Sequence, residues 1–422
     1  MKKRVAIITN DTSLVGGLTT MVSFLHKTLI ESACFEPQLI SLATSASDKA
    51  SVQIKSPATW FRRPNVENIT GSQLSFTHFG VWGSELEFQR YRPRRELTEH
   101  LSEFDLLQFV VGSPPWVCVA ENVNRPIILW TATTTRADRT SQVANGSFFR
   151  RGLSSIMIPI AERYEKRALE LADRILVLSE YTRKSVAEIA GSETIALAPC
   201  GVDTTLFHPG AEKVRRSYIL CVARLSDPRK NIRLLLDAYA KLRLTMPSIP
   251  DLLLIGDPPS AEIQNHLQNI GLANQVHLVG PKQSEELAEL YRNAMFFVLS
   301  SNEEGLAIVI LEAMASGLPV VSTDCGGPAT AIADGETGFL TSVGDVDALA
   351  AAMEKLLNDQ ALCERMGREG RRVAEERFSL SAAGKVFLDT YEDVLTSGTA
   401  RAPGTKALQT AAVLPRPARA HD

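Results

Sequence analysis

The stretch that decides the fold is SSNEEGLAIVILEAMASGLPVVSTDCGG, residues 300–327. Apolar residues at helical spacing over residues 306–316 predict a helix that ends at Gly317. Short apolar runs at residues 294–299 and 319–323 predict a buried strand on either side of this helix. An alternation of strand, helix and strand is typical of a parallel sheet covered by helices.

Two glutamates in this stretch point to a ligand. Glu304 and Glu312 lie eight positions apart, so both carboxylates are expected on one side of the helix, about a quarter-turn from each other. The predicted first turn, Leu306, Ala307 and Ile308, has apolar side chains and backbone N–H groups without helical acceptors. Such a terminus binds a phosphate or a developing anion. A capped helix with solvated glutamates is the alternative that these residues leave open.

Two cations precede another predicted helix. Arg224 and Lys230 lie six positions apart, between a predicted strand at residues 218–223 and a predicted helix at residues 232–243. Arginine can hold a diphosphate through two parallel hydrogen bonds, whereas lysine acts as a point charge. Either residue alone is explained as a surface cation, but the two together beside a helix N-terminus favour a diphosphate site.

The first predicted strand and helix, residues 4–9 and 18–32, are joined by a loop that ends in Gly16 and Gly17. Glycine lets a backbone approach a phosphate or a sugar closely, although a tight turn explains the pair equally well. Farther on, predicted strands at residues 105–111 and 126–131 are each followed by a loop. Ligands of open parallel sheets bind beyond the carboxyl ends of strands, so these loops are candidate site loops.

Composition limits the classes of protein. A chain of 422 residues predicts two or three domains, and a net charge of −3 without a polycationic tract argues against a nucleic-acid partner. The six cysteines lack metal-ligand spacing and suit buried thiols in a reducing compartment. The N-terminal apolar run is too short for a signal peptide, and no run is long enough to span a bilayer. We therefore expect a cytoplasmic protein.

Contact with a membrane surface stays open. Arginines at positions 90, 92, 94 and 95 alternate with acidic residues, which is typical of a solvated face. The alternative is a surface for an anionic acceptor or for a peripheral membrane contact.

Strands and helices alternate through both halves, which predicts an α/β protein with two doubly wound parallel sheets. We expect a first domain at residues 1–205, completed by a terminal helix at 378–396 that packs back onto it. A second domain is expected at residues 206–377. The tail from 397 to 422 has little to bury and is expected to be disordered.

The run EGLAIVILEAMASGLPVV, residues 304–321, strongly resembles the donor-binding segment of family-four glycosyltransferases, which are retaining enzymes of GT-B fold. Residues 199–209 resemble the interdomain signature of this family, and residues 221–231 resemble its diphosphate-binding loop. The resemblance implies two Rossmann-like domains that face a cleft, with the nucleotide-sugar donor held by the second domain.

The resemblance also implies a role for each matching residue. Glu312 would hold the ribose hydroxyls, Glu304 the donor sugar, and Arg224 and Lys230 the diphosphate. The catalytic residues implied are Glu304, Arg224 and Lys230. The donor-binding residues implied are Gly16, Gly17, Arg224, Lys230, Gly280, Pro281, Lys282, Glu304, Gly305, Leu306, Ala307, Ile308 and Glu312.

One departure from the family pattern concerns the acceptor side. The family usually carries a histidine after the strand that ends near residue 131, but no histidine lies between His100 and His208 in this chain. Thr131 or Arg136 could take over its contact with the sugar.

The activity implied is retaining transfer of a sugar from a UDP- or GDP-sugar to an acceptor hydroxyl on a saccharide, a lipid-linked intermediate or a small natural product. The nucleotide-sugar is a co-substrate, so no cofactor is expected, and protein cations take the place of a metal. A nucleotide-sugar epimerase of the same fold and a non-catalytic nucleotide-sugar-binding protein are the alternatives.

Overall fold

The computed structural model describes residues 2–10, 16–70, 74–137, 148–191, 195–210, 218–246 and 248–397. Their contacts divide the chain into two units, and each unit is described by itself. The N-terminal unit runs up to Pro199 and resumes at Gly384, whereas the C-terminal unit runs from Cys200 to Ala383. The division therefore falls a few residues before the boundary expected at 205.

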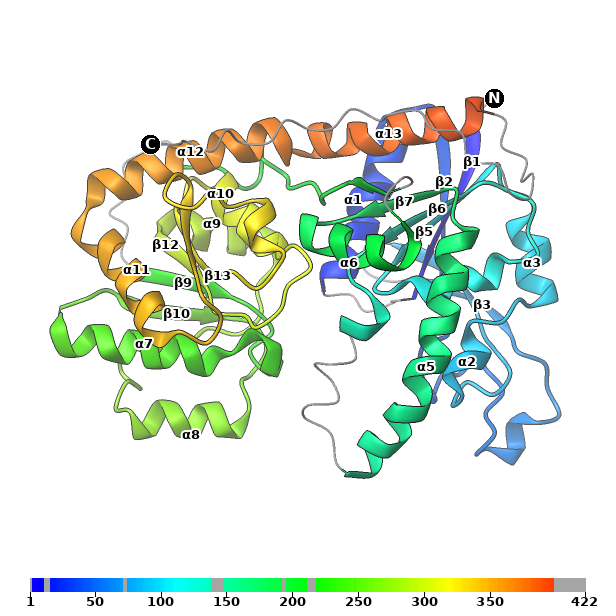
Figure 1. The fold of residues 1–422 in the computed structure, drawn as a ribbon, viewed down its shortest axis with the longest axis horizontal. Coiled ribbons are helices and arrows are strands. Elements are labelled where there is room, and N and C mark those ends of the chain that lie inside the picture. Colours follow the sequence, from blue (N-terminus) through cyan, green and yellow to red (C-terminus); the bar gives the residue numbers. More distant parts are fainter. Residues whose placement is uncertain are drawn as a thin grey trace. The chain divides into compact units, whose positions relative to one another are not determined.

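The N-terminal unit is built on one sheet, with its described strands in the order β3-β4-β2-β1-β5-β6-β7-β8 (Figure 1). Neighbouring strands are parallel except β3, which runs antiparallel to β4. The strands are β1 (Lys3–Thr9), β2 (Phe35–Leu42), β3 (Val66–Thr70), β4 (Ser75–Phe79), β5 (Leu106–Val111), β6 (Ile127–Thr131), β7 (Arg174–Val177) and β8 (Ile195–Leu197). The α-helices are α1 (Gly17–Glu31), α2 (Glu87–Arg90), α3 (Arg95–Leu101), α5 (Phe148–Leu171) and α6 (Glu180–Ala190), and the 3₁₀ helices are η1 (Pro57–Thr59) and η2 (Pro114–Ala120).

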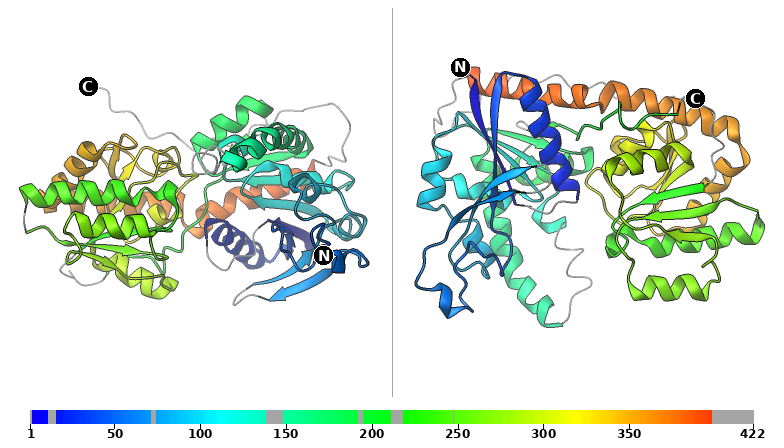
Figure 2. Two further views of the ribbon diagram at one scale, coloured as in Figure 1. Left: turned by 90° about the horizontal axis from the view of Figure 1, so that it is seen from below. Right: turned by 180° about the vertical axis from the view of Figure 1, so that it is seen from behind.

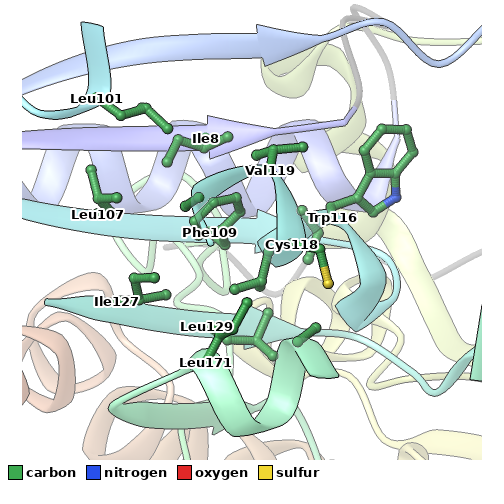
Figure 3. Packing of buried hydrophobic residues seen from close by; sticks show 14 of the residues in the cluster. Ile8, Leu101, Leu107, Phe109, Trp116, Cys118, Val119, Ile127, Leu129 and Leu171 are labelled. Carbon is green, nitrogen blue, oxygen red and sulfur yellow. The ribbon is translucent and has the colours of Figure 1, made fainter. Parts of the chain in front are cut away.

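The central strands of this sheet are buried on both faces, which is why they read as continuous apolar runs. On one face, Ile8, Phe109 and Leu129 pack against η2 and α5, as Figure 3 shows from close by. On the other face, Trp130 of β6 packs against the ring of Phe24 of α1.

The last described helix, α13 (Leu380–Thr396), completes this second face. The ring of Phe387 lies 4.6 Å from that of Trp130, and the Tyr391 hydroxyl donates a hydrogen bond to Gln108 Oε1 at 2.8 Å. Figures 1 and 2 show α13 beside α1. The terminal helix predicted to return to the first domain is therefore confirmed. The tail beyond Ser397 lies outside the described residues.

The C-terminal unit has a parallel sheet in the order β11-β10-β9-β12-β13-β14. The strands are β9 (Tyr218–Val222), β10 (Asp251–Ile255), β11 (Val276–Leu278), β12 (Ala294–Leu299), β13 (Val320–Thr323) and β14 (Gly338–Thr341). The helices are α7 (Ile232–Thr245), α8 (Ala261–Asn269), α9 (Ser284–Asn293), α10 (Ile308–Ala315), α11 (Val346–Asn358) and α12 (Gln360–Arg377), with 3₁₀ turns η3 (Pro228–Lys230) and η4 (Pro328–Thr330). Because β9, β12 and β13 are neighbours, the loops at their carboxyl ends meet.

The prediction of two doubly wound α/β sheets is confirmed. The antiparallel strand β3 is a departure from it, and β3, β4 and α8 were not predicted. In the described part of the chain, no helix has both the length and the apolar content to cross a membrane. All six cysteines are free thiols, and five of them are buried as expected, but Cys34 is exposed.

The arginine-rich segment is only partly the solvated face that its charge pattern predicted. Arg95 is exposed and pairs with Glu99 at 2.8 Å. The guanidinium of Arg94, in contrast, donates to the Gly80 carbonyl at 3.2 Å, and burial lowers the pKa of Arg94 to about 10.

Candidate active site

The loop that follows β9 is tied to the loop that follows β12. The Asn302 amide donates to the Arg229 carbonyl at 2.7 Å, and the Ser300 hydroxyl donates to the Lys230 carbonyl at 3.0 Å. The side-chain amide of Asn231 donates to Asn302 Oδ1 at 2.9 Å. These bonds fix the cation-bearing loop against the glutamate-bearing loop.

The consequence is an ion pair between Lys230 and Glu304. Lys230 Nζ lies 2.6 Å from Glu304 Oε1, and the two side chains are only 16% and 10% exposed. The Ser301 hydroxyl donates to the same carboxylate oxygen at 2.6 Å. Restricted solvent access strengthens these contacts relative to a surface pair.

The backbone of Glu304 is held by the segment that follows β13. The Glu304 amide donates to the Cys325 carbonyl at 3.2 Å, and the Gly327 amide donates to the Glu304 carbonyl at 2.9 Å. A Cβ atom on Gly327 would lie 2.5 Å from the carbonyl carbon of Gly305. Only glycine therefore permits this close approach.

The helix after Glu304 begins later than predicted. α10 starts at Ile308 rather than Leu306, because Ala307 adopts a left-handed conformation with φ of 64°. Glu304 lies before the helix, as expected, but Glu312 lies about one turn into it rather than two. The helical angle between the two glutamates does not apply, and it is the ion pair with Lys230 that positions Glu304.

The shifted start still leaves backbone donors at this terminus. The amide of Ile310 donates to the Ala307 carbonyl at 2.9 Å. The amides of Ala307, Ile308 and Val309 donate to no carbonyl within the described residues. Their position after β12, together with the helix dipole, suits an anion.

Glu312 has a different environment from Glu304. The hydroxyl of Tyr291, on α9, donates to Glu312 Oε2 at 2.9 Å. Burial raises the pKa of Glu312 to about 7, although the hydrogen bond from Tyr291 acts in the opposite direction. Tyr291 itself is fully buried and its ring lies edge-on against Phe207 at 5.7 Å.

Arg224 lies on the same loop as Lys230 but has its own partner. Its guanidinium is 2.9 Å from Asp227 Oδ2, and Arg229 shares this carboxylate at 2.8 Å. The Arg224 side chain is 61% exposed. The structure thus brings Lys230 to Glu304, whereas Arg224 pairs with Asp227.

The predicted nucleobase loop follows β11, which β10 separates from β9. Gly280 has a positive φ of 78°, and Pro281 follows it. Lys282 pairs with Glu286 of α9 at 3.0 Å.

The remaining predicted residues belong to the N-terminal unit. Gly16 precedes α1 and Gly17 is its first residue. The buried Thr131 hydroxyl donates to the Gly112 carbonyl at 3.1 Å. Arg136 Nε donates to Glu162 at 3.0 Å, with its side chain 78% exposed. The roles of these four residues stay predictions.

Three residues of the C-terminal unit were missed. Ser301 and Tyr291 hold the two glutamates, and Gly327 lets the loop close. Tyr291 could have been found from the sequence, because it lies on the apolar side of the predicted helix 284–293. A tyrosine hydroxyl that is buried in this way needs a hydrogen-bond partner. Across the described ranges, no group of three or more His, Cys, Asp or Glu side chains could hold a metal.

This chain is similar to a known protein family and to several curated proteins. Residues 203–373 match the family model described as "Glycosyl transferases group 1". An MMP alpha-(1->4)-mannosyltransferase of Mycolicibacterium hassiacum is 30% identical over 61% of this chain and 63% of its own length. A GDP-mannose-dependent alpha-(1-6)-phosphatidylinositol monomannoside mannosyltransferase of Mycolicibacterium smegmatis is 31% identical over 54% of this chain and 64% of its own. The matches thus span about three fifths of these relatives.

Solved structures match over almost the whole chain. A sucrose-phosphate synthase from Thermosynechococcus elongatus has a TM-score of 0.73 at 21% identity, covering 94% of this chain and 100% of that one. HepE of Anabaena in complex with UDP has a TM-score of 0.70 at 17% identity, covering 93% of this chain and 100% of that one. These likenesses concern the fold.

The fold is therefore GT-B, as predicted, with two Rossmann-like α/β units. Residues 203–373 are similar to the group 1 glycosyltransferases, and this match supports the resemblance to family four that the sequence indicated.

Proposed function

We propose that this chain transfers a hexose from a UDP- or GDP-sugar to an acceptor hydroxyl, with retention of the anomeric configuration and without a metal. The observation that carries this proposal is the convergence of Lys230, Glu304 and the first amides of α10 at the carboxyl ends of β9 and β12. This grouping supplies a cation and oriented dipoles for a leaving diphosphate, and a carboxylate for the sugar beside it.

The diphosphate carries most of the charge that the site must stabilise. Lys230 has three N–H donors, so it can keep its contact with Glu304 and still reach a phosphate oxygen. The amides of Ala307, Ile308 and Val309 would hold further oxygens at the positive end of the helix dipole. Arg224 is exposed enough to leave Asp227 and add a bidentate contact.

Glu304 would orient the donor sugar, and its charge would support the oxocarbenium-like centre that forms as the glycosidic bond breaks. The departing phosphate oxygen would accept the proton of the acceptor hydroxyl on the same face, which accounts for retention without a side-chain base. Because preorganised protein cations stabilise the leaving group, we assign no metal or cofactor to this reaction. Glu312, held by Tyr291, would bind the ribose hydroxyls.

Names of the relatives guide the choice of substrates. One relative is named as dependent on GDP-mannose, and HepE is described in complex with UDP-glucose. The acceptors in such names are a phosphatidylinositol mannoside and D-inositol 3-phosphate. We therefore propose GDP-mannose and UDP-glucose as the first donors to test, with inositol-containing and saccharide acceptors.

A binding experiment comes first. Isothermal titration calorimetry with UDP, GDP and their sugars should reveal one preferred nucleotide. A thermal-shift assay should detect the same preference, because a ligand at 100 times its Kd adds about 2.7 kcal/mol to the stability of the folded protein. Absence of binding to every nucleoside diphosphate would refute the proposal. With the preferred donor, NMR of the product reports its anomeric configuration, and EDTA should leave the rate unchanged.

Lys230→Ala tests the leaving-group role. Removal of one preorganised electrostatic contact should reduce transfer about 100-fold. Lys241→Ala is the matched control, because Lys241 forms an exposed pair with Asp347 and should be neutral. An isomerised sugar after incubation with donor alone would instead identify an epimerase.

A further inference from the structure

A group of large apolar side chains that includes none of the residues assigned to the donor is exposed in the N-terminal unit. Phe61 is 98% exposed, and Trp60 and Trp82 are each 54% exposed. Ile54 joins them at 36%. We call residues 49–63 together with Trp82 the aromatic tip. The segment from 49 to 63 lies at an extremity of the unit, in blue in Figure 1. Side chains of this size gather at a surface when they have a partner to contact.

Hydrogen bonds to its backbone hold the tip in place. Val52 forms a β-bridge with Trp82, and the Gly83 amide donates to the Val52 carbonyl at 2.8 Å. The Glu85 carboxylate accepts hydrogen bonds from the backbone amides of Ile54 and Lys55, both at 2.9 Å. The exposure of the rings is therefore a property of an ordered loop.

The polar group of Trp60 is satisfied within the tip. Its indole N–H donates to the carbonyls of Gln53 and Ile54, at 3.0 and 3.1 Å. About half of the side chain stays exposed as apolar surface, and Phe61, the next residue in the chain, is almost fully exposed. A ring with a satisfied polar edge and an exposed apolar body is suited to the boundary between water and hydrocarbon.

The tip carries more positive than negative charge. Residues 49–63 contain four cations, Lys49, Lys55, Arg62 and Arg63, and no acidic residue, although Asp48 precedes them and the whole chain has a net charge of −3. Arg62 donates to the carbonyls of Lys49 and Ser51. Among the described residues, none of the four cations forms an ion pair, whereas exposed cations of this chain commonly do. The tip thus combines exposed aromatic rings with an excess of positive over negative charge, because Glu85 is the acidic side chain bound to its backbone and the segment itself contributes four cations.

We propose that the aromatic tip docks this protein on an anionic lipid surface. Trp60, Phe61 and Trp82 insert at the level of the headgroups, and Lys55 and Arg63 contact lipid phosphates. This combination favours a bilayer over a protein partner, because the cores of protein interfaces are depleted in lysine, whereas aromatic residues beside cations are typical of membrane interfaces. The proposal goes beyond the transfer reaction and does not depend on it.

Tryptophan fluorescence provides the direct test. Of the four tryptophans, Trp116 and Trp130 are buried, so a change on docking reports Trp60 and Trp82. The full chain is titrated with vesicles of phosphatidylcholine alone, or with 30% phosphatidylglycerol, at low and at high salt. We expect a saturable blue shift and flotation with the anionic vesicles only, weakened by salt, and quenching by lipids brominated near the headgroup.

Two variants separate the apolar and the charged contributions. Phe61→Ser should weaken binding to anionic vesicles about tenfold or more, because a large apolar side chain loses its burial. The double variant Lys55→Glu with Arg63→Glu should have a similar effect through the reversed charge. Leu244→Ser, at a side chain that is 85% exposed in the C-terminal unit, and Lys385→Glu are the matched controls and should bind as the wild type does.

Several results would overturn the proposal. Absence of binding to anionic vesicles, or equal losses in the tip and control variants, would remove the lipid role. If Phe61→Ser bound normally while the charge reversal did not, the aromatic residues would not be the anchor. A concentration-dependent dimer in sedimentation analysis that Phe61→Ser dissociates, without vesicle binding, would assign the tip to a second copy of this chain.

Discussion

Replacement of Glu312 by glutamine should stabilise the C-terminal unit, and the gain should depend on pH. Burial raises the pKa of Glu312 from 4.5 to about 7, so ionising this carboxyl costs more in the folded than in the unfolded chain. The shift corresponds to about 3 kcal/mol at pH values above 7. Glutamine removes the charge but can still accept the hydrogen bond from Tyr291.

The sign follows from the raised pKa. Above pH 7, Glu312 is ionised in both states, and the full cost of burying the charge opposes folding. As the pH falls toward 4.5, the folded protein takes up the proton first and the cost disappears. The stabilising effect of Glu312→Gln should therefore be about 3 kcal/mol at pH 8 and about 1 kcal/mol or less at pH 5.

Hydrogen exchange of peptides from β12 and β13 measures the stability of this unit, because both strands are buried beside α10. The four tryptophans all lie in the N-terminal unit, so their fluorescence during urea unfolding serves as an internal control that should not change. A gain of the same size at pH 5 and pH 8, or a loss at pH 8, would refute the argument from burial.

Three further variants test the site. Glu304→Gln should lower the transfer rate about 100-fold with little effect on nucleoside diphosphate affinity, and near wild-type turnover would contradict its role at the sugar. Gly327→Ala should weaken diphosphate binding, because the added Cβ would lie 2.5 Å from the carbonyl carbon of Gly305. Calorimetry measures this affinity, and an unchanged value would mean that the loop adapts to the added Cβ. Tyr291→Phe should raise the pKa of Glu312 further, so that UDP or GDP affinity falls near pH 7, whereas the affinity for a 2′,3′-dideoxynucleoside diphosphate should not. Equal losses for both ligands would assign Tyr291 a packing role.

The sequence predicted the strands and helices whose apolar periodicity is strong. Helix 284–293 and strand 294–299 have the predicted bounds, because buried apolar positions define them. Strand β3 was missed since its residues are exposed or half-buried in alternation, so no continuous apolar run marks it. Helix α8 was missed for a similar reason, because Leu267 is its one buried residue.

The site was predicted as a set of residues but not as a geometry. The expected angle between Glu304 and Glu312 assumed a helix that begins at Leu306, yet the left-handed conformation of Ala307 delays its start. Alanine rarely adopts this conformation, so local propensity gives no sign of it. The contact of Lys230 with Glu304 joins residues 74 positions apart and depends on two strands being neighbours in the sheet. Tertiary pairing of this kind is not encoded in a local pattern.

The path of the chain through α13 reverses the usual order in which domains mature during synthesis. The N-terminal unit buries Trp130 against Phe387 and satisfies Gln108 through Tyr391, both of which emerge from the ribosome after the whole C-terminal unit. A nascent chain that stops before Gly384 holds an N-terminal unit with one aromatic face uncovered. The unit that is translated first is thus the last to close its core, and chaperones that recognise exposed apolar surface have the longest access to it.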